Sequence, residues 1–231
     1  MKRGVAIAVA VAIAVAIGLF ARHASEPEKA SPAPAAVDAA PPPPRAPDAP
    51  LPAAADSDAR VRSLFGPISP RPELGEWLST PDLLERGAAT IDNLAEDVSP
   101  RKQVPFLAPK GAYQPHRFDR YDAFADVIGS MDPRAVAGAV RALHPLLEAA
   151  YHRLGYPDRN LDATLARALQ RVVDAPLADA EVKPRGPVYV YVDPKLEALG
   201  PVEKHLLRMG PRNQRLVQDQ ARAILAALKQ P

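Results

Sequence analysis

The chain of 231 residues carries 29 Lys and Arg against 27 Asp and Glu, and from residue 56 onward the two kinds number 24 and 23. A stretch so close to neutral has no excess of basic residues to displace counterions from phosphates, so we expect no nucleic-acid partner. There is no cysteine, which excludes disulfides, thiolate metal ligands and a cysteine nucleophile.

The first residues predict a membrane anchor. Residues 4–21 are 18 uncharged, mostly apolar residues, which as a helix span about 27 Å, just enough for the hydrocarbon core. Lys2 and Arg3 precede the run, which favours an inside N-terminus. We therefore expect residues 1–23 to anchor a single-pass inner-membrane protein that contacts the lipid bilayer through residues 4–21 and holds its C-terminal domain in the periplasm. The alternative is a cleaved signal peptide, although a cut after Ala21 would put the large Leu19 at the −3 position.

The following residues, 24–55, predict a disordered Pro/Ala-rich linker. Ten prolines lie between Pro27 and Pro52, and large apolar residues are almost absent, so the segment cannot bury a core. Such a segment favours polyproline II and reaches up to ~100 Å when extended. We expect a passive spacer. The alternative is a Pro-rich ligand for a groove-type partner, with Arg45 after four prolines as its one hint.

Residues 56–231 predict one mainly α-helical domain with a minor extended or β element. Helix-start and apolar-spacing signals first predict a helix capped within Asp56–Asp58 and running to Phe65, a short amphipathic turn at 74–78, and a helix that is capped by Thr80, has Pro81 as its first residue and ends at Ser99. Further helices are predicted at about 121–131, 133–154 and 161–172. A loop over 176–187 and a strand at 188–192 follow, then a helix started by Asp193-Pro194 and a last helix after the Gly210-Pro211 corner. Because Pro145 removes a backbone donor, we expect a kink or break near His144.

Several strings resemble one bacterial family. They are HPLLEAAY at 144–151, LGYPD at 154–158, VYVDPKLEAL at 190–199 and LRMGPRN at 207–213, with TIDNLA at 90–95 and RYD at 120–122 upstream. Together they resemble the family called domain of unknown function 3014, over about residues 56–228. The resemblance implies the same layout of anchor, Pro-rich spacer and single domain. It implies no reaction, ligand or cofactor.

Two groups of side chains are candidates for chemistry. His144, Glu148 and His152 recur every four residues, as metal ligands on one helix face would, but Pro145 disturbs the first turn. Asp119, Asp122 and Asp126 could pair for acid–base work, although acids at a helix start also interact favourably with the helix dipole. We interpret both groups as structural.

Other catalytic signatures are missing from the sequence. There is no nucleophile elbow, phosphate-binding loop or dinucleotide fingerprint, so we predict no catalytic residue, cofactor or metal. The leading hypothesis is a non-enzymatic binding or envelope-assembly module with an envelope protein as its partner. The alternative is a carboxylate-dependent envelope hydrolase that uses Asp92 or Asp122.

The stretch 189–213 predicts where a partner would bind. Helix capping and turn formation explain Asp193-Pro194 and Gly210-Pro211 without a ligand, and we prefer that explanation to a binding groove at Met209–Asn213. Four side chains in this stretch are left unexplained by local backbone rules. We predict that they form the interaction surface: Tyr189, Tyr191, Arg208 and Asn213.

Overall fold

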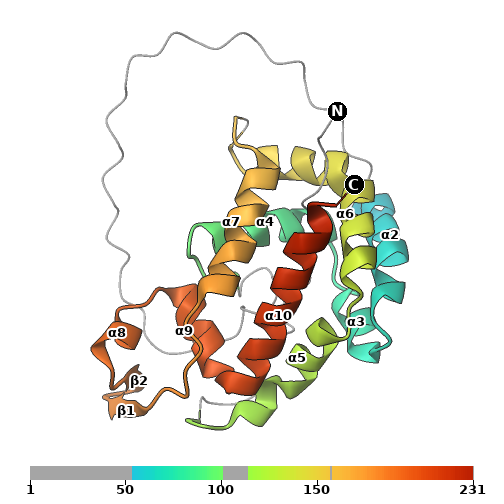
Figure 1. The fold of residues 1–231 in the computed structure, drawn as a ribbon. Coiled ribbons are helices and arrows are strands. Elements are labelled where there is room, and N and C mark those ends of the chain that lie inside the picture. The colour runs from blue at the N-terminus through green and yellow to red at the C-terminus, as the bar shows by residue number, and fades with distance from the viewer. Residues whose placement is uncertain (1–53, 101–113, 157, 231) are drawn as a thin grey trace, which may run out of the picture.

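The computed structural model describes residues 54–100, 114–156 and 158–230. These residues form a mainly helical domain with one small hairpin, as the sequence predicts (Figure 1). The predicted anchor and nearly all of the predicted linker lie outside the described residues. Within the described part of the chain, no helix is both long and apolar enough to cross a bilayer.

The helices and strands follow one another in this order: α2 (Ala54–Phe65), η1 (Gly66–Ile68), α3 (Pro72–Trp77), α4 (Leu83–Ala95), η4 (Phe118–Tyr121), α5 (Asp122–Gly129), α6 (Pro133–His152), α7 (Leu161–Asp174), β1 (Val182–Arg185), β2 (Val188–Tyr191), α8 (Pro194–Glu197), α9 (Pro201–Arg208) and α10 (Gly210–Leu228).

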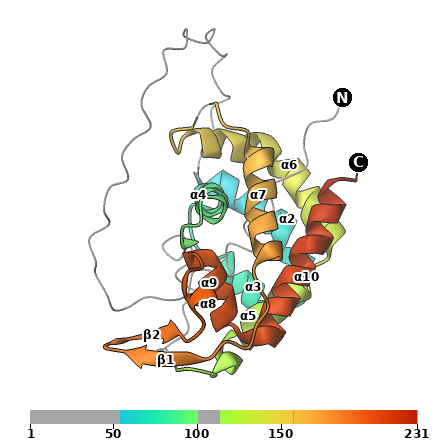
Figure 2. The ribbon, with the colours of Figure 1, turned by 60° about the vertical axis from the view of Figure 1, so that its left-hand side comes forward.

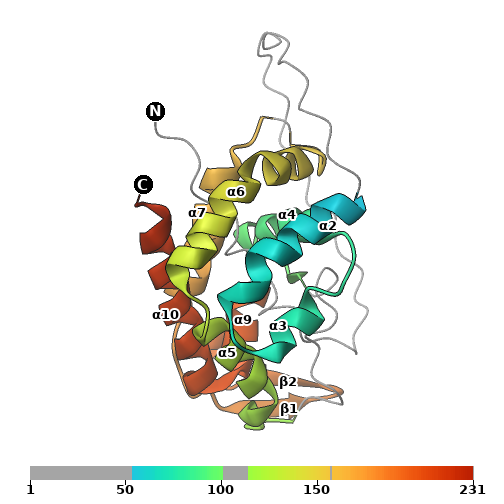
Figure 3. The ribbon, with the colours of Figure 1, turned by 90° about the vertical axis from the view of Figure 1, so that its right-hand side faces the viewer.

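The last helix, α10, is the centre of the packing. It lies against α5, α6 and α7, and α4 in turn packs on α6 and α7 (Figures 2 and 3). The core between them consists mainly of Leu, Val, Ile and Ala, with Phe65, Tyr121 and Tyr151 as the largest fully buried side chains. The apolar spacing that predicts the helices therefore corresponds to core-facing side chains, except at Val98 and Leu154, which lie beyond the ends of α4 and α6 and are exposed.

Buried glutamines of α10 donate hydrogen bonds to carbonyls at the ends of neighbouring elements. Gln218 Nε2 donates to the carbonyls of Val172, Val173 and Ala175 at 3.1, 3.3 and 2.7 Å, where α7 ends. Gln220 Nε2 donates to Met131 O at 2.8 Å just after α5. The last carbonyls of a helix have no partner within that helix, and an amide from another helix satisfies them without burying a charge.

The start of α4 differs from the prediction. Thr80 does not cap the helix, because its Oγ1 donates back to Trp77 O at 2.9 Å. The cap comes instead from the buried carboxylate of Asp58 in α2, which accepts from Asp82 N at 3.0 Å and from Leu83 N at 2.8 Å. The helix consequently begins at Leu83, two residues later than Pro81. It ends at Ala95, and Val98 beyond it is exposed.

Pro145 lies within one continuous helix, α6, on its exposed side. The ribbon of α6 changes direction along its length (Figure 3). A kink is therefore present, as expected, and a break is not. Of the other predicted caps, Asp132 accepts from Arg134 N at 2.8 Å and Asp193 accepts from Lys195 N at 2.8 Å. The predicted helix start within Asp56–Asp58 is wrong, since α2 already begins at Ala54.

The predicted loop over 176–187 is wrong in its second half, since Val182–Arg185 forms β1 and pairs antiparallel with β2. Arg185 lies opposite Val188, so only Gly186 and Pro187 connect the strands. Gly186 has φ +60°, and glycine adopts this conformation readily at the first position of a two-residue hairpin turn. Pro184 argued against a strand in the sequence, because proline is tolerated in a sheet only where no neighbouring strand needs its N–H.

Candidate functional site

The hairpin forms an arm that extends from the helical body (Figures 1 and 2). We use the name arm for residues 182–192. Three of the large hydrophobic residues that are exposed in the described chain lie in the arm or just before it: Leu177, Tyr189 and Val192. The arm is therefore the first candidate for contacts outside the domain.

Each outer edge of the arm has one backbone position at which a further strand cannot pair. Pro184 has no N–H on the outer edge of β1. On β2, Tyr191 N donates to Glu197 Oε2 of α8 at 2.9 Å. These two features disfavour strand addition at either edge, because strand addition needs free backbone groups along the edge.

Of the two predicted tyrosines, only Tyr189 is exposed, at 41%, whereas Tyr191 is 6% exposed. Tyr191 Oη donates to Lys204 O of α9 at 3.1 Å and so attaches the base of the arm to the body. Glu197 reinforces this attachment. Burial acts to raise the pKa of Glu197, but the hydrogen bond from Tyr191 N and the ammonium of Lys204, 3.2 Å away, outweigh it and lower the pKa.

Asn213 is 1% exposed and holds the corner between α9 and α10. Its Nδ2 lies 2.9–3.1 Å from three acceptors: Phe118 O, Asp122 Oδ1 and Met209 O. The predicted four-residue surface is therefore not one surface, because Asn213 and Tyr191 use their polar groups inside the domain.

Gly210 makes the α9–α10 corner sterically possible. It has φ +78°, and a Cβ at this position would lie 2.4 Å from the ring of Phe118. Pro211 then follows in the first turn of α10. The turn itself thus explains the residues of the Met209–Asn213 stretch, and this is the explanation that the sequence favours over a binding groove.

Arg208 is half-buried in the last turn of α9. Its positive charge helps to lower the pKa of Glu197, and within the described residues it makes no ion pair. Of the four predicted surface residues, Arg208 and Tyr189 are therefore the two whose side chains are at least partly exposed.

Asp92 lies in a second cluster, at the junction of α4, α6 and α7. Its side chain is 14% exposed, and its Oδ1 lies 3.9 Å from Nη1 of Arg159, in the connection between α6 and α7. Burial raises the pKa of Asp92, and the charge of Glu96 raises it further, while Arg159 and the hydroxyl of Tyr151 act in the opposite direction. A partly buried carboxyl with a raised pKa is a feature of general acids, and also of strained structural clusters.

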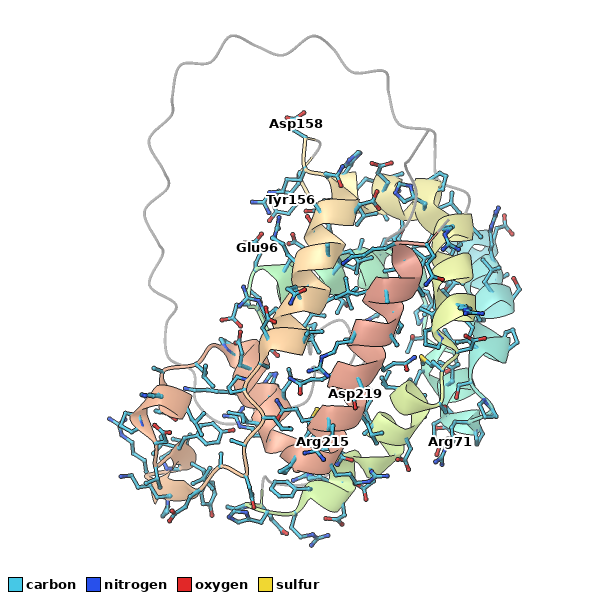
Figure 4. The ribbon with its side chains drawn as sticks, viewed as in Figure 1. Arg71, Glu96, Tyr156, Asp158, Arg215 and Asp219 are labelled. Carbon is cyan, nitrogen blue, oxygen red and sulfur yellow. The ribbon has the colours of Figure 1, made fainter. Side chains whose placement is uncertain are left out.

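Arg159 is the centre of this Asp92 cluster, although no sequence pattern indicated it. Its guanidinium lies 4.3 Å from the ring centroid of Tyr156, and its Nη1 donates to Glu96 Oε1 at 3.0 Å. Arg167 of α7 also reaches Glu96, at 3.2 Å. These contacts attach the α6–α7 connection to α4, at the end of the domain that lies away from the arm (Figure 4).

The two acids of the hydrolase hypothesis do not share partners. Asp122 accepts from Asn213, and Arg212 reaches both Asp122, at 3.5 Å, and Asp126, at 2.7 Å. Asp119, the third member of the predicted carboxylate group, pairs instead with Arg117 at 3.0 Å. The partners of Asp92 are a different set.

The two histidines of the pattern on α6 also have different neighbours. His144 Nε2 lies 3.1 Å from Asp162 Oδ1 of α7, and its Nδ1 lies 3.8 Å from Glu148. The ring of His152 instead lies beside Tyr151, with centroids 6.4 Å apart. Among the described residues, no group of three or more His, Asp or Glu is arranged to hold a metal ion.

A model of one protein family matches residues 83–225, and its description is Protein of unknown function (DUF3014). The chain belongs to this family. No curated protein and no solved structure matches the chain.

The DUF3014 match runs from the start of α4 into the last turns of α10. Strings that carry the resemblance meet in space. Asp92, Tyr151 and Tyr156 come from three of them and form one cluster, while Asp122 and Asn213 come from two others and are hydrogen-bonded. These residues of the strings therefore hold helices of the domain together.

Proposed function

We propose that this DUF3014 chain is a single-pass inner-membrane protein whose periplasmic domain is a non-enzymatic binding or envelope-assembly module. The predicted anchor at residues 4–21 and the predicted Pro-rich spacer support the tethering. An envelope protein is the proposed partner.

One observation carries the non-enzymatic part of the proposal. The two acids of the hydrolase hypothesis have separate partners: Asp92 lies near Arg159, whereas Asp122 accepts from Asn213 and shares Arg212 with Asp126. Two-carboxylate catalysis requires both groups at one substrate. This arrangement supports a function that depends on the surface of the domain.

In-cell photo-crosslinking tests the proposal. A photoreactive side chain at Arg208 or Tyr189 in the full chain should give an adduct with the same envelope protein in repeated preparations. The matched control is the same label at Ser63, an exposed residue of α2. If the adducts at all three positions are indistinguishable, there is no specific partner surface at Arg208 and Tyr189, and the proposal fails.

The raised pKa of Asp92 favours a second candidate, an envelope hydrolase with Asp92 as its general acid. Incubation of the full chain with isolated cell-wall material should then release soluble fragments. Asp92→Asn should abolish the release, whereas Asp119→Asn, at an exposed acid, should not. Under the binding-module proposal, neither variant differs from the wild type and no fragments appear.

A further inference from the structure

The arm combines exposed apolar and basic side chains without any acid. Between Glu181 and Asp193 the sequence is VKPRGPVYVYV, with two basic residues and no acidic one. Lys183 and Arg185 are both exposed, and neither makes an ion pair within the described part of the chain. Most basic side chains of the body differ in this respect, because Arg62, Arg71, Arg171 and Arg212 are each paired with an acid.

The strand register assigns these side chains to faces. Lys183 lies opposite Val190, and Arg185 lies opposite Val188, so one face combines two cations with two valines, and Glu181, opposite Val192, lies at the base of this face. The other face carries Tyr189 opposite Pro184 near the tip, and Tyr191 against α9 at the base. Because Tyr191 joins the base of its face to the body, the face with Lys183 and Arg185 is directed away from α9.

This composition fits the interface of a lipid bilayer. Tyrosine is enriched at the level of the headgroups, and Lys and Arg place their stems along apolar surface while their charges reach the headgroup phosphates. The edges of the arm, with Pro184 on β1 and Glu197 at β2, disfavour a partner strand. Side chains that enter a bilayer interface need no backbone pairing.

We propose that the arm contacts the anionic surface of the membrane to which the chain is tethered. The inference rests on the tethering in the proposed function. Each basic residue near an anionic surface favours contact by a factor of about five, so contact through two basic residues is weak for a domain that is free in solution. A tether raises the effective concentration to roughly the millimolar range, and at that concentration a weak contact is populated.

The reach of the tether is sufficient. The domain is roughly 40 Å across for its length, whereas the spacer extends up to ~100 Å. The domain can therefore turn its arm to the bilayer wherever the spacer joins it. The contact is reversible and holds the domain close to the membrane until a partner competes for it.

The absence of cysteine from the chain allows a clean test. The full chain is reconstituted with one introduced cysteine carrying an environment-sensitive fluorophore, at Pro187 in the turn of the arm or at Asp158 at the far end (Figure 4). The vesicles contain phosphatidylcholine with or without phosphatidylglycerol, and a spin-labelled lipid as quencher. We expect quenching at Pro187 in the anionic vesicles and little quenching at Asp158.

The charge variant Lys183→Gln/Arg185→Gln should lower the ratio of contacting to free arms about 25-fold. Quenching that is equal at the two labels, or that is independent of phosphatidylglycerol, overturns the inference. Absence of lipid adducts from a photoreactive label at Pro187 in the anionic vesicles also overturns it.

Failure of the tether is distinguishable from failure of the arm. Alkaline extraction of the vesicles releases the chain if residues 4–21 are not an anchor. If only the arm inference is wrong, the chain stays with the vesicles and the Pro187 label remains unquenched.

Discussion

The carboxylate of Asp58 connects two helices that are far apart in sequence, and removing it gives a sharp test of how the domain is held together. Asp58 is 5% exposed and accepts from Asp82 N and Leu83 N at the start of α4. In Asp58→Ala both backbone donors lose their acceptor. Loss of a cap costs about 1 kcal/mol, and a buried donor without a partner costs about 1–3 kcal/mol.

We therefore expect Asp58→Ala to lower the free energy of unfolding by about 2–4 kcal/mol, or to lower Tm by roughly 10 °C for a domain of this size. The lost ion pair with Arg62 adds little, because the Arg62 side chain is 40% exposed. Asp58→Asn keeps one acceptor oxygen and should be less destabilising than Asp58→Ala.

Urea unfolding of the detergent-solubilised full chain, followed by tryptophan fluorescence, measures this directly. Trp77 is the single tryptophan of the chain, is 8% exposed and stacks on Phe124 with ring centroids 5.6 Å apart. The control is Asp56→Ala, an exposed acid in the first turn of α2, which should cost less than about 1 kcal/mol. Equal losses in the two alanine variants would refute the reasoning.

Three further predictions test other parts of the fold. Gly210→Ala should destabilise by about 2–4 kcal/mol in urea titration, because alanine is strained at φ +78° and its Cβ meets the Phe118 ring; a loss under about 0.5 kcal/mol would count against the corner as described. Gln218→Leu should cost about 1–3 kcal/mol, since the carbonyls at the end of α7 lose their donor, and unchanged exchange protection of the α10 amides would contradict it. The raised pKa of Asp92 means that the folded state binds this proton more tightly than the unfolded state does, so the stabilisation it gives is present in acid and is lost as pH rises through the folded pKa. The free energy of unfolding of the wild type, relative to that of Asp92→Asn, should therefore fall from acid to neutral pH. A difference between the two proteins that does not change with pH would contradict this.

Local signals in the sequence predicted most of the helices, because apolar spacing and caps act within a few residues. Asp132 and Asp193 cap the helices that directly follow them, as predicted. The start of α4 could not be predicted in this way, since its cap, Asp58, is 25 residues from Leu83 and the nearby Thr80 offered a plausible local alternative.

The same distinction explains the outcome for the predicted surface residues. The roles of Tyr191 and Asn213 cannot be seen in the sequence because most of their acceptors are distant. Lys204 O is 13 residues from Tyr191, and Phe118 O and Asp122 are more than 90 residues from Asn213. β1 was missed because Pro184 is unfavourable within a sheet, and only the exposed position of the hairpin tolerates it. Arg159 could not be found from a motif, since its role depends on how α4 and α7 meet.

The location of the domain is the premise of both proposals, and one labelling measurement tests it most directly. A membrane-impermeant maleimide is added to spheroplasts that express the full chain with its single introduced cysteine at Asp158. Exposure of the domain on the periplasmic side predicts labelling of intact spheroplasts at the same level as after lysis. Labelling that appears only after lysis would contradict the proposed orientation and, with it, the proposed function.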